Sequence, residues 1–222
     1  MTAARLRDAG EPAPGAKIMY HGERFNGYSH LCGFLLATAG SAMLISKTVT
    51  GDDPAKTASA LVFGVSMMVL YAASTIFHST RGPMKRFWQR VDHCAIYLLI
   101  GGSYTPFALV TLEGPWGWAL LAGIWAAAIV GIGRELRPGD PPKPSLLIYL
   151  GMGWLGALVL GPLVERLDGA GVAWVLTGAL LYSAGTIFYA NPRGWRHAHG
   201  TWHLFVIGGT LCHYVAVTQF VL

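Results

Sequence analysis

Two histidines near the carboxyl end of the chain, His199 and His203, are four positions apart. On a helix this spacing places both imidazoles on one face, one turn apart, which is a chelating geometry. Catalytic zinc usually takes three protein ligands and leaves a fourth tetrahedral position to water, so His78 would complete the set from another helix. Three imidazoles also suit other transition metals. The pair alone is a weak metal signal, because solvated histidines at a membrane interface can show the same spacing.

Two further polar residues would complete such a site. Asp92 is suited to hold a metal-bound water, accept its proton and offset part of the metal's charge. Ser74 precedes His78 by four residues and shares its helix face, where its hydroxyl could bond the water or a substrate oxygen. The alternative for Ser74 is a hydroxyl that packs helices together. We predict Asp92 and Ser74 as catalytic residues, and the three histidines as ligands of Zn²⁺.

The remaining histidines give less clear signals. His30 and His93 suit either supporting partners of the site or buried structural residues. His213 lies ten residues beyond His203, so it points about 80° away around the helix and almost three turns deeper, which argues against a shared metal. Glu23 and Asn26 precede the first apolar run, where we expect them to cap a helix.

The composition shows what kind of scaffold must position these residues. The 222 residues are 53% hydrophobic and only 12% charged, about half the charged fraction of a soluble protein. A soluble globule of this length could not bury so much apolar surface, so lipid must cover much of it. The net charge of +5 comes without a basic stripe or an aromatic-interleaved patch, so we expect no nucleic-acid partner.

Seven windows are apolar enough and long enough to span a membrane as helices. Short polar or Gly/Pro-rich breaks separate them, so consecutive helices are expected to be antiparallel neighbours. We predict an all-α, seven-transmembrane-helix bundle over residues 23–222, preceded by a flexible cytoplasmic tail over residues 1–22. The predicted spans are Gly27 to Ile45, Ala58 to His78, Asp92 to Leu112, Trp116 to Ile132, Ser145 to Val164, Val172 to Tyr189 and Thr201 to Leu222.

The distribution of Lys and Arg predicts the direction of the bundle, because cytoplasmic loops carry the excess of these residues. The side opposite the amino terminus holds only Lys47, Lys56 and Arg166. The amino-terminal side holds all the others: Arg5, Arg7, Lys17, Arg24, Arg81, Lys85, Arg86, Arg90, Arg134, Arg137, Lys143, Arg193 and Arg196. The amino terminus is therefore predicted inside and, with seven spans, the carboxyl terminus outside.

This topology brings the candidate residues to one depth. His78 ends the second predicted span, Asp92 begins the third, and His199 and His203 open the seventh. All four lie within about one or two helical turns of the cytoplasmic boundary. Ionisable side chains are costly at such positions, so each of them is a functional candidate.

The same residues carry a resemblance to a known family. Ser74-x-x-x-His78, then Asp92, then His199-x-x-x-His203 resembles the hemolysin III branch of the progestin and adiponectin receptor family. The resemblance covers nearly the whole chain from about Tyr20 to Leu222. It also includes the stretches Glu23-Arg24-x-Asn26-x-x-Ser29-His30, Asp92-His93, Gly102-Ser103-Tyr104-Thr105-Pro106 and Trp202-His203-Leu204-Phe205-Val206.

The resemblance implies a multi-pass protein of the bacterial inner membrane, with zinc held by His78, His199 and His203, Asp92 on the zinc-bound water, and Ser74 in the serine position. Relatives of this family include ceramidases, so the implied activity is zinc-dependent hydrolysis of an acyl-amide or ester lipid. Membrane lipids are the expected partners, and the sequence sets no oligomeric state. Two alternatives stay open: a non-enzymatic sensor of membrane state with a structural zinc, and a cytolytic membrane protein.

Overall fold

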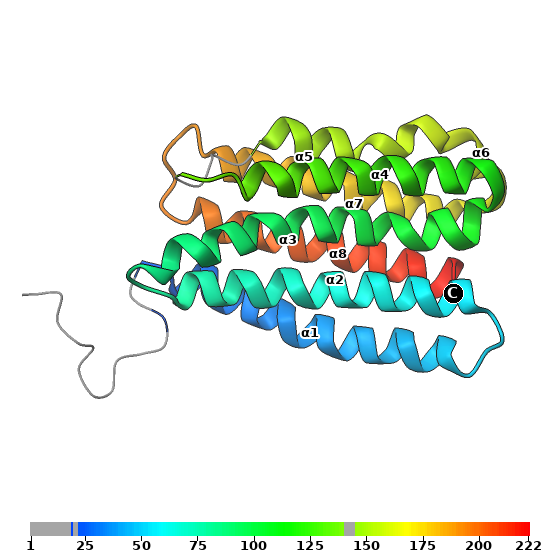
Figure 1. Ribbon diagram of the computed structural model, residues 1–222, viewed down its shortest axis with the longest axis horizontal. Helices are drawn as coiled ribbons and strands as arrows, with labels where there is room; N and C mark the ends of the chain where they lie inside the picture. Colours follow the sequence, from blue (N-terminus) through cyan, green and yellow to red (C-terminus); the bar gives the residue numbers. More distant parts are fainter. Residues whose placement is uncertain (1–18, 20–21, 140–144) are drawn as a thin grey trace, which may run out of the picture.

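The computed structural model describes residues 19, 22–139 and 145–222, and this part of the chain forms a bundle of helices (Figure 1). Most of the predicted tail over residues 1–22, and also Lys143, lie outside the described residues. The helices are α1 (Arg24–Val49), α2 (Pro54–Ser79), α3 (Met84–Pro106) with a π-helical continuation (Phe107–Leu112), α4 (Gly114–Glu135), α5 (Leu146–Gly153), a 3₁₀ segment (Leu155–Val159), α6 (Leu160–Arg166), α7 (Gly169–Ala190) and α8 (Ala198–Phe220).

Among the described residues, six helical stretches are long and apolar enough to cross a membrane, by length and composition. They correspond to the first six predicted spans, with α5, the 3₁₀ segment and α6 together forming the fifth. Helix α8 has 23 residues, but its histidines and glutamine lower its apolar content. The third span begins at Met84 rather than at Asp92, so Asp92 lies in the third turn of α3 and not at its first residue.

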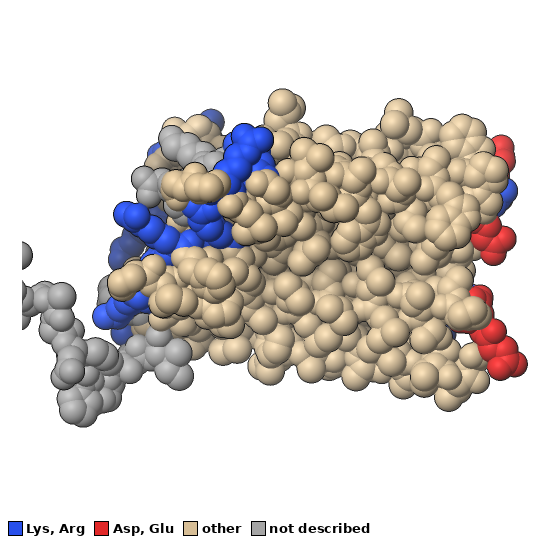
Figure 2. Space-filling view, viewed as in Figure 1, with Lys and Arg blue, Asp and Glu red and all other residues tan. Residues whose placement is uncertain are grey.

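The surface of the bundle has the distribution expected of a protein surrounded by lipid. Large apolar side chains are widely exposed along the helices, among them Leu35, Ile129, Val130, Leu147 and Leu158, each more than 60% exposed. On the face shown in Figure 2, most of the Lys and Arg lie at one end of the bundle and the visible acidic residues at the other, with a broad uncharged belt between them. An apolar belt between two charged ends is what a bilayer requires. The chain is therefore a multi-span membrane protein.

Close packing of small residues holds the helices together. Helix α2 packs against both α1 and α3, α7 packs against α8, and α8 also contacts α1. A Cβ atom on Gly102 in α3 would overlap the Ser66 side chain of α2, and one on Gly64 in α2 would lie 2.9 Å from Oγ of Ser41 in α1. Small residues allow such close backbone approach, which is the main source of helix association in lipid.

Local sequence signals fix the ends of the helices that carry the candidate histidines. Asp53 caps α2, its carboxylate accepting from the backbone N–H groups of Ala55 (2.9 Å) and Lys56 (3.2 Å), with Pro54 at the first helical position. Helix α7 ends at Asn191 in the left-handed conformation, with φ of 44°. The Asn191 amide then binds both backbone groups of Trp195, at 2.7 and 3.2 Å. This turn sets the direction in which α8 begins.

Candidate metal centre

The structure brings the three predicted histidine ligands together at one end of the bundle. His78 lies in the last turn of α2, and His199 and His203 lie in the first two turns of α8. Their ring centroids are 4.7–5.1 Å apart. One nitrogen from each ring lies within 4.8 Å of the other two, so the group could hold a metal ion. His78 and His203 are buried, 2% and 0% exposed.

Within the described part of the chain, Nε2 of each of these histidines is buried without a hydrogen-bond partner. Three unpaired nitrogens in one buried place are costly unless something binds them. The tetrahedral geometry of zinc with three imidazoles requires such converging lone pairs. The residues present therefore fit a divalent transition metal.

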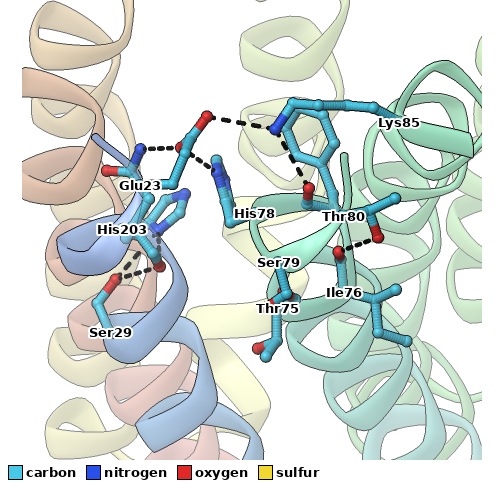
Figure 3. Close-up of polar contacts among 11 residues, drawn as sticks. Glu23, Ser29, Thr75, Ile76, His78, Ser79, Thr80, Lys85 and His203 are labelled. Carbon is cyan, nitrogen blue, oxygen red and sulfur yellow. Dashed lines mark hydrogen bonds and ion pairs between the residues drawn. The ribbon is translucent and has the colours of Figure 1, made fainter. Parts of the chain in front are cut away.

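The other ring nitrogen, Nδ1, is used by the protein in two of the three histidines (Figure 3). Nδ1 of His78 lies 2.7 Å from Oε2 of Glu23. Nδ1 of His203 lies 3.0 Å from the carbonyl oxygen of Asn26 and 3.1 Å from Oγ of Ser29, whose own proton is donated to that same carbonyl. Since these partners accept, Nδ1 carries the proton in both rings. The Nε2 lone pairs are then free for a ligand, as in metal-binding histidines with supporting acceptors.

Glu23 has a different role from the predicted helix cap. It precedes α1, yet its side chain makes no capping hydrogen bond. Its carboxylate instead accepts from His78, from the Asn26 amide at 2.7 Å and from Lys85 at 3.3 Å, which joins α1, α2 and α3. The hydrogen bond from His78 is the main cause that lowers the pKa of Glu23 well below its usual range, against the opposing effect of burial. Glu23 thus remains a carboxylate.

Asp92 lies beside this cluster, as its predicted role requires. It is buried, 6% exposed, and its carboxylate lies close enough to His78 and Ser74 to be influenced by both. The Ser74 hydroxyl is also buried, and it makes no hydrogen bond of standard geometry to another described residue. The role of Asp92 as proton acceptor and that of Ser74 as a hydroxyl that bonds the water or a substrate oxygen stay predictions, and the positions of both beside His78 are compatible with them.

His30 and His213 have separate environments, which their sequence positions could not establish. The His30 ring stacks on His203 with centroids 3.5 Å apart and planes inclined by 12°, and Tyr71 meets its edge. Neither ring nitrogen of His30 has a partner among the residues that are described. His213 instead places Nε2 3.2 Å from the Val175 carbonyl oxygen of α7. Stacking gives His30 a supporting position behind one candidate ligand, and His213 lies outside the centre.

Two cavities lie beside the cluster and share part of their walls. The first, about 420 Å³ and called the chamber below, is bordered by Asp92, His93, Tyr189, His199 and Trp202. The second, about 100 Å³ and called the apolar cavity below, shares Asp92 and Trp202 with the chamber and lies between α3, α5, α7 and α8, where apolar side chains form most of its wall. A chamber with mixed lining beside an apolar cavity suits a molecule with a polar head and a hydrocarbon chain.

Comparison with known proteins agrees with this architecture. The family model described as "Haemolysin-III related" matches residues 18–214. The chain is 40% identical over 199 residues to "Hemolysin-3" of Bacillus cereus, which covers 89% of this chain and 90% of that one. It is 38% identical over 194 residues to the "Hemolysin-3 homolog" of Bacillus subtilis (strain 168), covering 86% and 91%. A more distant match, 22% identical over 237 residues, is the "Adiponectin receptor protein" of Drosophila melanogaster, covering 90% and 50%.

The predicted resemblance is thereby confirmed at the level of the family, while the comparisons leave the ion and the reaction open. The matched region contains every residue of the histidine cluster, as well as Ser74 and Asp92. The chain belongs to the haemolysin-III-related family, the hemolysin III branch of the progestin and adiponectin receptor family.

Proposed function

We propose that this protein is a zinc-dependent membrane hydrolase that cleaves an acyl-amide or ester lipid. The observation that carries the proposal is the meeting of three histidine rings, each with a buried, unpartnered Nε2, beside a buried carboxylate and an apolar cavity. A set of three imidazoles leaves a fourth tetrahedral position for water, which is typical of catalytic rather than structural zinc.

Each residue of the centre has its own role in the proposed reaction. His78, His199 and His203 would hold the ion, which when bound supplies a Lewis acid that activates a water and polarises a carbonyl. Asp92 takes the proton of the attacking water, for which its position near His78 is suitable. Ser74 supplies a hydroxyl near the Asp92 carboxylate. The apolar cavity holds the acyl chain, and its apolar wall disfavours water.

We also propose how the chain is oriented in the membrane. Seven spans, with α8 as the seventh, would place the amino terminus in the cytoplasm of a bacterial inner membrane and the carboxyl terminus outside. The concentration of Lys and Arg at the end of the bundle that holds the histidines supports this direction (Figure 2). The centre would then lie near the cytoplasmic leaflet, where the head group of a membrane lipid can reach it.

A non-enzymatic sensor with a structural zinc is the second candidate, and one observation favours it. Glu23, His78 and His203 already join α1, α2 and α8 through hydrogen bonds, and an ion would tighten this junction. The cytolytic function in the relatives' names receives less support, because the apolar cavity described above lacks the polar or charged lining of ion-conducting pores.

Two measurements on purified protein separate these functions. Elemental analysis should find one zinc per chain in wild type and little in His199→Ala. Zinc-loaded wild type should release fatty acid from a ceramide-like amide or an acyl ester, and Asp92→Asn should keep the zinc and lose turnover by about 10²–10⁴-fold. If the protein binds zinc but cleaves neither substrate while a reference hydrolase is active in the same assay, the structural role of zinc remains. Absence of any bound metal would contradict both functions.

A further inference from the structure

A second buried acid–base pair borders the same chamber as the histidine cluster. His93 in α3 is 6% exposed and lines the chamber together with Asp92 and His199. Its Nδ1 lies 3.3 Å from Oε2 of Glu135, the last residue of α4. Glu135 is fully buried, with 0% of its surface exposed. A buried carboxylate at the end of a membrane helix is costly and therefore a functional candidate.

Helix packing alone gives a weak reason for this pair. The guanidinium of Arg90 in α3 already donates to the carbonyl oxygens of Glu135 (2.9 Å), Arg137 (2.6 Å) and Gly139. The end of α4 is thus fixed on α3 through backbone groups. A leucine at position 135 would keep these bonds and avoid burying a carboxylate, which is often neutral or favourable for stability. The Glu135 carboxylate also has Arg134 as an ion-pair neighbour, with Oε1 3.9 Å from Nη1, but that distance is too long for a hydrogen bond. The contact of Oε2 with His93 therefore needs another explanation.

The contact with Glu135 determines which ring nitrogen of His93 carries the proton. Because the Glu135 carboxylate accepts from Nδ1, the imidazole holds its proton there and leaves Nε2 unprotonated, on a side chain that lines the chamber. A carboxylate behind an imidazole fixes the tautomer and the ring orientation, and it stabilises the imidazolium when a second proton is taken up at Nε2. The pair can therefore receive and return a proton at Nε2 of His93.

We propose that His93, oriented by Glu135, is the proton donor to the leaving group, separate from Asp92 as the proton acceptor. This role rests on the proposed hydrolysis. In amide cleavage, Asp92 takes a proton from the attacking water. Asp92 passes this proton to the unprotonated Nε2 of His93, which becomes an imidazolium beside the Glu135 carboxylate. The water oxygen has bonded to the carbonyl carbon, and the carbon–nitrogen bond then breaks with its electron pair going to nitrogen. That nitrogen takes the proton from Nε2 of His93, so both side chains return to their starting states, one water is consumed, and one acid and one amine are formed.

The role predicts a dependence on the leaving group. An alkylamine needs a proton to leave, whereas a 4-nitrophenolate leaves without one. The test uses full-length, zinc-loaded protein with two probes of the same acyl chain, an N-alkyl amide and a 4-nitrophenyl ester. His93→Gln should slow the amide by about 10²–10⁴-fold and leave ester turnover near the wild-type rate. Glu135→Gln should act in the same direction with a smaller loss.

Controls separate this role from a packing defect. His197→Gln changes an exposed histidine at the start of α8 and should leave both rates unchanged. Zinc content is measured in each variant, because a displaced α3 would disturb the centre and slow both probes. Equal losses on amide and ester, or no loss on either, would overturn the role of His93 while the hydrolase stands. Wild type that cleaves neither probe overturns the proposed function and this role together.

Discussion

Helix α8 contains buried or half-buried histidines at two depths, and they differ in how the protein uses their nitrogens. At its start, His199 and His203 lie beside His78, each with an unpaired Nε2, while the Nδ1 of His203 is taken by acceptors from α1. About 15 Å deeper, Nε2 of His213 lies near a single backbone carbonyl oxygen, and no comparable imidazole cluster surrounds it among the described residues. A buried histidine is thus a candidate ligand when other elements supply both the acceptor behind it and the partners in front of it.

The largest effect should come from removing one of the converging rings. His78→Ala should reduce the metal content of the purified protein from one ion per chain to near zero, because two imidazoles on one helix leave a site half filled. His213→Ala is the matched change at the other depth of α8 and should retain the metal. Elemental analysis in parallel gives the answer, and metal retained in the first variant but lost in the second would reverse the comparison.

Removing the acceptor behind a ligand should have a smaller effect. Glu23→Gln takes the charge from the group that holds Nδ1 of His78, and we expect about a 10–100-fold weaker affinity for zinc. Competition with a chromogenic chelator measures this affinity. Glu165→Gln, an exposed carboxylate outside the centre, is the control. Equal affinities in all three proteins would show that the contact between Glu23 and His78 does not support the metal.

Glu23 should stay ionised when the pH is lowered from 8 to 5. Its pKa is lowered from a reference value of 4.5, so its stabilising effect is fully present above about pH 4.5 and is lost only as the pH falls through the lowered value. Between pH 8 and pH 5, metal loss should therefore follow protonation of the histidines alone. Infrared difference spectra of wild type against Glu23→Gln should show Glu23 as an ionised carboxylate across this range. A band of protonated Glu23 above pH 5 would contradict a lowered pKa.

The smallest effect is expected from Ser29→Ala. Ser29 supplies one of two acceptors for Nδ1 of His203, and the Asn26 carbonyl oxygen remains. Loss of one such hydrogen bond corresponds to about 0.5–1.5 kcal/mol, or about two- to tenfold in zinc affinity. Chelator competition again provides the measurement. A loss as large as that of His78→Ala would mean that the serine, and not the backbone, orients the ring.

The sequence predicted the elements better than it predicted the contacts between them. Apolar windows identify helices well, because lipid allows few alternatives to a helix, and the spacing of His199 and His203 gives their shared face directly. Two limits have physical causes. Helix α3 extends over polar residues before Asp92, since an interface tolerates a polar helical turn that a hydropathy window excludes. From its sequence position Glu23 is a candidate helix cap, whereas its carboxylate accepts a hydrogen bond from His78, 55 positions away.

Contacts between distant helices depend on the rotation of each helix about its axis, which one sequence does not contain. His30 illustrates this, because its stacking on His203 needs α1 and α8 in one relative orientation. The pairing of His93 with Glu135 depends in the same way on α3 and α4. Glu135, a carboxylate close to the end of an apolar window, was the available sequence signal for that pair. No spacing rule links it to His93.

The turn at Asn191 and Trp195 has a consequence for how this family can vary. A single insertion between Asn191 and Trp195 would separate the two residues whose hydrogen bonds set where α8 begins, and would displace His199 and His203 together relative to His78. Loops at the opposite end of the bundle carry no such constraint, since no member of the cluster depends on their length. Length differences among relatives should therefore be tolerated at that opposite end and rare in this seven-residue connection, residues 191–197.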